Sequence, residues 1–209
     1  MKGRLVTFEG IDGCGKTTQL LRLRKILVSR KVRCIVTREP GGTRTAEQIR
    51  VIILNPANKA LSSRAELLLY LAARAQHVEE IIAPALAAGR TVLSDRFFDA
   101  TFAYQGGGRS LPMDEIHKMN RFACAGIVPD LTFLFDLPAK AALQRIYKGR
   151  GVKDRMEREG ARFMEKVRKA YLALAKKEPR RFRVIDASKD VKRVATEVLR
   201  QYKEWEKAL

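Results

Sequence analysis

Short apolar runs alternate along the chain with longer segments in which apolar residues recur every three to four positions. The short runs have the length and composition of buried β-strands, and the longer segments have the period of amphipathic helices. The predicted strands are Arg4–Glu9, Val32–Thr37, Thr91–Ser94, Asp130–Asp136 and Arg183–Asp186. Because helical segments separate the strands, the pattern predicts an α/β fold with a five-stranded parallel sheet flanked by helices.

Eight helices are predicted between and after these strands. They span Lys16 to about Ser29, Thr45–Leu54, Ser63 to about Ile82, Phe97–Tyr104, Pro112–Ala125, Ala139–Lys148, Glu157–Lys177 and Asp190 to about Glu206. Ser63 and Glu66 have the spacing of a capping box at the start of the third helix, and Pro84 is expected to end or kink it. The glycines at 106–108 are expected to form a flexible break. With no repeat, low-complexity tract or linker, residues 1–209 are predicted to form one domain.

A glycine-rich segment links the first predicted strand to the first helix. Residues 10–18 read GIDGCGKTT and satisfy the pattern G-x-x-x-x-G-K-[ST]. The backbone N–H groups of such a loop converge on a phosphate, and the helix N-terminus adds partial positive charge. Lys16 can then reach the β- and γ-phosphates, while the Thr17 hydroxyl can ligate Mg2+. The predicted ATP-binding residues are Gly10, Ile11, Asp12, Gly13, Cys14, Gly15, Lys16, Thr17 and Thr18.

The three cysteines lack the spacing of a zinc site, so we interpret them as reduced thiols. Cys14 lies in the phosphate loop, where converging dipoles and Lys16 would favour a reactive thiolate. The alternative, which we favour, is a small side chain chosen for packing.

Composition restricts the partners and the location. At 209 residues with 46% hydrophobic content, the chain can bury a substantial core. No run approaches the roughly 20 apolar residues that cross a bilayer, and the N-terminal run is too short for a signal peptide, so we expect a cytoplasmic protein without a membrane partner. The net charge is +19, and residues 140–209 hold 22 Lys and Arg against 10 Asp and Glu. We interpret this excess as solvated helix surface and expect no nucleic-acid partner.

The ends of the predicted strands indicate where a ligand binds. In open parallel sheets the ligand lies beyond the carboxyl ends of the strands, where residues 10–17, 38–42 and 95–96 follow the first three strands. A GTPase switch needs an Asn-Lys-x-Asp segment, but Leu61 stands where Asp is required after Asn58. An ATP-driven motor would need a second module for which this length has no room.

A kinase that acts on a small anionic acceptor remains the favoured class. Such an enzyme needs arginines on loops that close over two sets of phosphates, because phosphoryl transfer depends on positioning and charge neutralisation. Arg38, Arg96, Arg150 and Arg155 lie at strand ends or in the glycine-flanked segment near residue 150.

Several short motifs, taken together, resemble those of thymidylate kinases over nearly the whole chain. They are FEGIDGCGKTT (8–18), TREPGGT (37–43), AARAQH (72–77), DRF (95–97), AYQG (103–106), PDLT (129–132) and DRME (154–157). The resemblance implies a P-loop nucleoside monophosphate kinase fold with a short mobile lid at about 149–158. It also implies transfer of the γ-phosphoryl group of ATP to dTMP, giving dTDP and ADP for dTTP synthesis, with Mg2+ as cofactor and usually a homodimer.

The resemblance further implies a role for each matching residue. The implied catalytic residues are Lys16, Arg96, Arg150, Asp12 and Arg155, and the implied metal-binding residues are Thr17 and Asp95. The implied dTMP-binding residues are Asp12, Arg38, Tyr70, Arg74, Arg96, Thr101, Tyr104 and Gln105. Arg38 would bind the dTMP phosphate, Tyr70 would stack on thymine and Arg74 would donate to its O4. Tyr104 would crowd the sugar 2′ position, and Gln105 would contact the base edge.

Three further alternatives stay open at this point. From the residues alone, a core position for Tyr70 is favoured, and only the resemblance reverses this. A kinase for another nucleoside monophosphate would share the loop and the lid, and a basic P-loop protein could bind nucleic acid and use ATP only as a switch.

Overall fold

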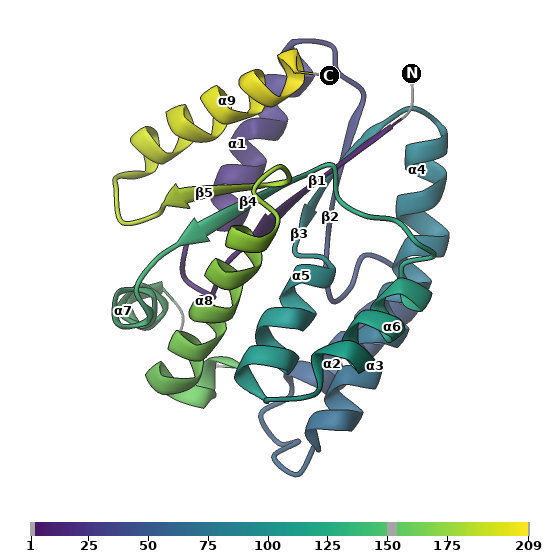
Figure 1. Ribbon diagram of the computed structural model, residues 1–209, viewed down its shortest axis with the longest axis vertical. Helices are drawn as coiled ribbons and strands as arrows, with labels where there is room; N and C mark the ends of the chain where they lie inside the picture. Colours follow the sequence, from purple (N-terminus) through teal and green to yellow (C-terminus); the bar gives the residue numbers. More distant parts are fainter. Residues whose placement is uncertain (1–2, 150–153, 209) are drawn as a thin grey trace.

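The computed structural model describes residues 3–149 and 154–208. Its strands are β1 (Arg4–Glu9), β2 (Cys34–Arg38), β3 (Thr91–Asp95), β4 (Leu131–Asp136) and β5 (Phe182–Asp186). Within the described residues they form one parallel sheet in the order β2-β3-β1-β4-β5, which confirms the predicted α/β fold (Figure 1). β1 lies at the centre of the sheet, and its apolar side chains are buried because helices cover both faces.

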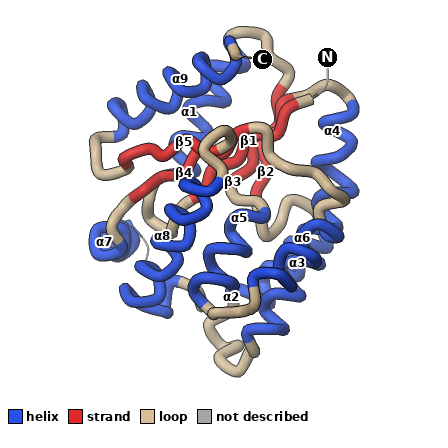
Figure 2. Tube along the Cα trace, viewed as in Figure 1, coloured by secondary structure: helices blue, strands red, loops and turns tan. Residues whose placement is uncertain are grey.

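Nine α-helices are assigned in the described part of the chain. They are α1 (Lys16–Ser29), α2 (Arg44–Leu54), α3 (Ser63–His77), α4 (Ala83–Ala87), α5 (Phe98–Thr101), α6 (Met113–Ala123), α7 (Ala139–Gly149), α8 (Gly160–Lys177) and α9 (Val191–Lys207). Two π-helical segments, η1 (Val78–Ile82) and η2 (Phe102–Gly108), and a 3-10 turn, η3 (Glu157–Glu159), join them. α1 packs against α9, while η2 packs against α8, so the sheet lies between two helical layers (Figure 2).

Several predicted boundaries are wrong, for local reasons. Strand β2 begins at Cys34 rather than Val32, because the Val32 N–H closes the turn after α1 by donating to the Leu27 carbonyl at 3.0 Å. The predicted helix from Glu157 is a 3-10 turn followed by α8, because Gly160 has a φ of 82° that interrupts helical geometry.

The third predicted helix also differs at both ends. Its N-cap is Ser62, whose hydroxyl accepts from the Ala65 N–H, so the predicted capping box from Ser63 is wrong, and Glu66 turns into the interior instead. The helical path passes Pro84 and continues to the end of α4. Proline is tolerated there because it lies in the first turn after a π-helical segment, where its missing N–H is not needed.

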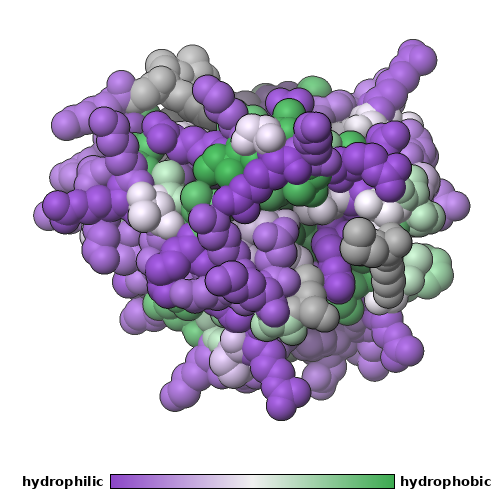
Figure 3. Space-filling model, turned by 90° about the horizontal axis from the view of Figure 1, so that it is seen from above, coloured by the Kyte–Doolittle hydropathy of each residue, from purple (hydrophilic) through white to green (hydrophobic). Residues whose placement is uncertain are grey.

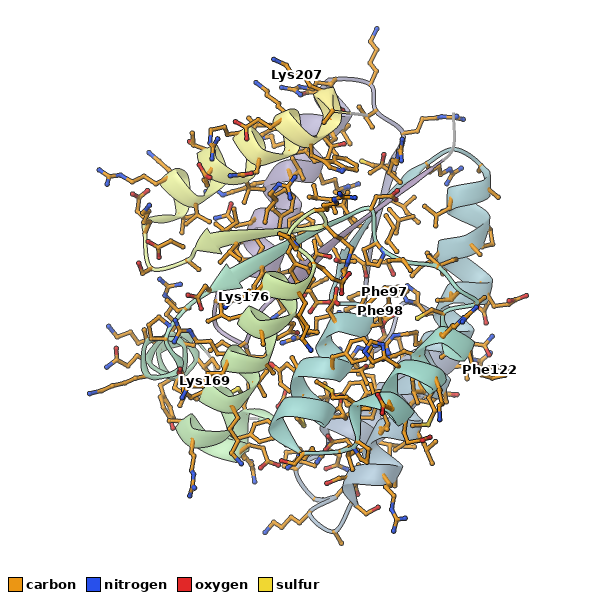
Figure 4. All side chains as sticks on the ribbon, viewed as in Figure 1. Phe97, Phe98, Phe122, Lys169, Lys176 and Lys207 are labelled. Carbon is orange, nitrogen blue, oxygen red and sulfur yellow. The ribbon has the colours of Figure 1, made fainter. Side chains whose placement is uncertain are left out.

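The glycines at 106–108 are helical, so the predicted flexible break is wrong. They allow close packing: a Cβ on Gly107 would lie 2.4 Å from the Ala170 Cβ of α8, and one on Gly108 would lie 2.6 Å from the Phe163 ring. Phe97, directly before α5, is directed into the core (Figure 4).

Polar side chains cover most of the end of the molecule that carries both termini (Figure 3). Lys207 extends from this end (Figure 4). No helix in the described ranges is long and apolar enough to cross a membrane.

We expect Gly107→Ala to lower the free energy of unfolding by about 1–3 kcal/mol, because the added methyl group forces η2 and α8 apart. Urea unfolding followed by circular dichroism measures the change. The matched control is Lys169→Ala on the exposed face of α8, which should change stability by less than about 0.5 kcal/mol. Equal stability of the two variants would contradict the packing role assigned to Gly107.

Candidate active site

A cleft of about 440 Å³ opens at the carboxyl ends of β1, β2 and β3. The predicted site residues that line it are Asp12, Gly13, Gly15, Lys16, Thr17, Thr18, Arg38, Tyr70, Asp95, Arg96, Thr101, Tyr104 and Gln105. One wall is therefore the phosphate loop and the other is formed by α3 and η2. The fold brings together residues that are up to 93 positions apart in the sequence.

The backbone of the phosphate loop depends on its glycines. Gly10 has a φ of 138°, and a Cβ there would lie 2.7 Å from the Phe135 carbonyl oxygen. Gly13 has a φ of 81°, and a Cβ would lie 2.5 Å from the Ala142 carbonyl oxygen. In the described structure no side chain caps the N-terminus of α1, so its first N–H groups are available to an anion.

Three charged side chains meet in the floor of the cleft. The Asp12 Oδ1 atom accepts from Lys16 Nζ at 3.2 Å and from Arg96 Nη2 at 2.9 Å. Burial alone would raise the pKa of Asp12, but Arg96 and Lys16 outweigh it and hold the pKa far below its ordinary value. Asp12 is therefore ionised and keeps two cations close to each other.

Arg96 is held in place through both its backbone and its side chain. Its φ of 73° lies in the left-handed region, and its N–H donates to the Phe8 carbonyl at 3.0 Å. The guanidinium donates to the hydroxyls of Tyr104 and Tyr171, each at 2.9 Å, and lies 4.8 Å from the centre of the Tyr104 ring. Such a constrained conformation is typical of functional sites.

The buried side chain of Glu9 lies behind Arg96 and bonds to both Tyr171 and the backbone that follows Arg96. Glu9 accepts from the Tyr171 hydroxyl and from the Phe97 N–H, both at 2.7 Å. Burial and the nearby Asp99 raise the pKa of Glu9 to about 8. Glu9 thereby links α8 to the residue that follows Arg96, and sequence reasoning did not identify either Glu9 or Tyr171.

The two predicted metal ligands lie side by side in the cleft. The Thr17 hydroxyl donates to the Asp95 carboxylate, and both residues line the same wall as Lys16. Hydroxyl and carboxylate oxygens are ligands that suit Mg2+, which usually keeps several waters and binds substrate phosphates as well. The residues present therefore fit Mg2+, although no cluster of three or more His, Cys, Asp or Glu occurs among the described residues.

The opposite wall contains the predicted acceptor residues. Tyr70 and the buried Tyr104 line it, and the Tyr104 hydroxyl lies 3.2 Å from Asp12 Oδ2. Arg38 is exposed at the mouth, where it forms a 2.9 Å ion pair with Glu47. Gln105 is almost wholly buried and donates from Nε2 to Glu66 at 2.8 Å.

Arg74 is placed behind this wall rather than at its surface, with 2% of its area exposed. It donates to Glu39 at 2.7 Å, to Thr101 at 2.7 Å, to Asn120 at 2.6 Å and to the Phe97 carbonyl at 3.2 Å. These bonds use four of its five N–H groups. Glu39 also bonds to His77, at 3.0 Å.

Only part of the predicted lid lies within the described residues. Arg150 and Lys153 lie outside the described residues. Arg155 is buried and does not line the cleft: it donates to the Ile53 carbonyl at 2.7 Å and forms a 2.7 Å ion pair with Glu66. In this arrangement Arg155 is an anchor, and the catalytic role expected of it finds no support.

Two residues of the loop serve the core instead of the cleft surface. Ile11 and Cys14 have 1% and 3% of their areas exposed. Burial raises the pKa of the Cys14 thiol despite the nearby Lys16. The packing interpretation of Cys14 is therefore favoured over the reactive thiolate.

Sequence reasoning missed two arginines that line the cleft. Arg50 on α2 donates to the Pro40 carbonyl at 2.8 Å, and Arg145 on α7 donates to the Ala187 carbonyl at 2.9 Å. Each lies within an amphipathic helix in a strongly basic sequence, where nothing local distinguishes it from a solvated arginine.

Comparison with known proteins gives one consistent result. A family model described as thymidylate kinase matches residues 8–198. A thymidylate kinase from Pelotomaculum thermopropionicum is 48% identical over 98% of this chain and 94% of its own length. A thymidylate kinase from Geobacter sp. strain M21 is 53% identical over 90% of this chain and 86% of its own length. The crystal structure of thymidylate kinase from Ehrlichia chaffeensis aligns with a TM-score of 0.79 at 33% identity, covering 97% of this chain and 99% of that one.

Proposed function

Because the chain belongs to the thymidylate kinase family, we propose that its cleft transfers the γ-phosphoryl group of ATP to dTMP, giving dTDP and ADP. The observation that carries this assignment is the position of Arg96. Its guanidinium lies between the phosphate loop and the wall that holds Tyr70 and Gln105, so it can contact the phosphates of two nucleotides at once.

We propose that each wall of the cleft binds one nucleotide. The loop and the first turn of α1 bind the ATP phosphates, with Lys16 on the β- and γ-phosphates. Arg38, at the mouth, binds the dTMP phosphate, and Arg50 beside it adds positive charge. Arg96 neutralises the charge that redistributes as the phosphates approach. Asp12 orients Lys16 and Arg96 and is close enough to the acceptor wall to bind the sugar 3′-OH.

The base and the sugar are proposed to lie against α3 and η2. Tyr70 lines the wall and provides a ring for stacking. Arg74 lies just behind the wall, and we propose that its one N–H group without a protein acceptor donates to thymine O4. Thr101 lines the wall as well, but its hydroxyl already accepts from Arg74, so we propose that it orients that arginine. Tyr104 narrows the space beside Asp12, where a 2′-hydroxyl would lie.

Mg2+ is the proposed cofactor. Thr17 would supply its hydroxyl to the metal, and Asp95 would bind through its carboxylate or through a metal-bound water. The ion would supply charge neutralisation at the β- and γ-phosphates. We assign the lid cation to Arg150, since Arg155 is engaged with Glu66.

A homodimer in the cytoplasm is also proposed. Exposed apolar side chains occur on the neighbouring helices α2, α3 and α6: Val51, Ile52, Leu68 and Phe122. Phe122 is 88% exposed and extends away from the body of the molecule (Figure 4). Free thiols at all three cysteines are typical of a reducing compartment.

The proposed reaction predicts a clear acceptor preference. In a coupled assay of ADP release with ATP and Mg2+, dTMP should support turnover at least about 100-fold above dGMP, dCMP or AMP, because a site that hydrogen-bonds a base strongly rejects one lacking the matching groups. Turnover with another monophosphate would keep the phosphate roles and reject thymine recognition. ADP release that only DNA or RNA stimulates would reject the kinase assignment.

Replacing Arg96 with Ala should lower kcat by about 100- to 1000-fold while the KM for ATP changes only a few-fold, because its charge matters most as the phosphates approach. Steady-state kinetics with saturating dTMP measure both constants. Arg22→Ala, on the exposed face of α1, is the matched control and should retain full activity. An unchanged kcat in the Arg96 variant would remove this residue from the mechanism.

If α2, α3 and α6 form the dimer surface, Phe122→Glu should produce monomers in sedimentation-velocity experiments, because it places a charge in an apolar contact. Leu21→Glu, at an exposed apolar position on α1, should leave the dimer intact. A wild-type protein that sediments as a monomer, or a Phe122 variant that remains dimeric, would contradict this surface.

A further inference from the structure

The carboxylate of Glu66 is surrounded by donor side chains from two other segments of the chain: η2 with its C-cap residue Arg109, and the segment that contains Arg155. Glu66 is completely buried on α3. Its Oε1 accepts from Gln105 Nε2 at 2.8 Å and from Arg109 Nε at 3.2 Å, and its Oε2 accepts from Arg109 Nη2 at 3.0 Å. Arg155 Nη2 lies 2.7 Å from the same Oε2. Burial alone would raise the pKa of Glu66, but the bonds from Arg109 and Gln105 outweigh it, so the carboxylate stays ionised.

An ionised carboxylate fixes the orientation of the Gln105 amide. A carboxylate only accepts hydrogen bonds, so the amide must turn its NH2 group towards Glu66 and its oxygen away. The reversed amide would place its oxygen against Glu66 Oε1 at this distance, so two acceptors would face each other and the Glu66–Gln105 hydrogen bond would be lost, which is costly in a buried site. Among the described residues, none donates a hydrogen bond to Gln105 Oε1, and Gln105 lines the cleft. The amide oxygen of Gln105 is therefore the hydrogen-bond acceptor that this residue offers to the cleft.

The position of this acceptor relates it to a bound base. Tyr70 lies one helical turn after Glu66 on α3, and both Tyr70 and Gln105 line the same wall. A ring for stacking and an acceptor for the edge of a base therefore come from neighbouring points of one wall.

We propose that Glu66 determines base specificity by holding the Gln105 amide so that its oxygen accepts the N3–H of thymine. Cytosine has a lone pair at N3, so in its complex two acceptors would face each other and both would lose a hydrogen bond. This inference rests on the proposed function, because it assumes that the base of the acceptor lies against this wall. Glu66 is a positioning residue and touches no substrate.

The same carboxylate also holds the C-terminal part of the predicted lid. Arg155, in the C-terminal part of the predicted lid, pairs with Glu66, and Arg109 also contacts Glu159, just after the lid, at 2.5 Å. These arginines keep Glu66 charged without taking part in the orientation of the amide. They make it possible to change the network while leaving the bond between Glu66 and Gln105 in place.

The test compares kcat/KM for dTMP and dCMP in Glu66→Gln and in the matched control Glu159→Gln. In the first variant the new amide can donate as well as accept, so Gln105 can turn and present its NH2 group to the cleft. We expect kcat/KM for dTMP to fall, that for dCMP to rise, and their ratio to drop at least about 10-fold. The control removes the same charge from the same network and should keep the wild-type ratio.

A folded Glu66→Gln variant with the wild-type ratio would overturn the proposal, as would an equal drop in the control. Thermal unfolding establishes that each variant is folded. If Glu66→Gln does not fold, Glu66→Asp takes its place, because it keeps the charge but withdraws the carboxylate from Gln105. The same drop in the ratio of kcat/KM values is expected of this variant. An unchanged ratio would again overturn the proposal. Failure of the proposed function is distinguishable, because the wild-type protein would then not prefer dTMP.

Discussion

The site depends on one buried interaction, the carboxylate of Asp12 placed between the cations of Lys16 and Arg96. Two largely buried cations placed side by side repel each other, and each loses hydration. Removing one partner from such a buried group typically costs about 3–5 kcal/mol, because the remaining charge has no counterion. The glycine backbone of the phosphate loop and the left-handed turn at Arg96 both serve to bring these three groups together. The arrangement is prepared for phosphates before any substrate arrives, which is how preorganised electrostatic catalysis operates.

Three buried glutamates support the residues around this cluster. Glu9 holds Tyr171 and the backbone after Arg96, Glu39 holds Arg74 and His77, and Glu66 holds Gln105 and two arginines. Each carboxylate joins segments that are distant in the sequence and aims at least one side chain at the cleft or its wall. These glutamates thus orient hydrogen-bonding groups. The donors outweigh burial at Glu39 and Glu66, whose pKa values are lowered, whereas burial dominates at Glu9 and raises its pKa.

Local patterns and motifs predicted most of the fold, and the reasons for the failures are specific. The phosphate loop could be identified because its chemistry requires glycines, Lys16 and Thr17 in a fixed order. The role of the glycines at 106–108 could not be predicted, because it depends on contacts with α8, more than fifty residues away. Glu66 was assigned to a helix cap because spacing alone cannot reveal that Arg109 and Arg155 converge on it. Likewise, Arg155 looked like a lid cation until its ion pair was known.

The central claim is that ATP and dTMP meet at Arg96 in a single cleft. A nucleotide analogue that joins adenosine and thymidine through a chain of five phosphates tests it directly by calorimetry. We predict that one analogue molecule binds per chain and that either saturating ATP or saturating dTMP weakens its binding. We also predict that the Arg96→Ala variant binds the analogue more weakly than the wild-type protein does. Binding of the analogue that only one of the two nucleotides weakens would show that they occupy separate sites and would contradict this account.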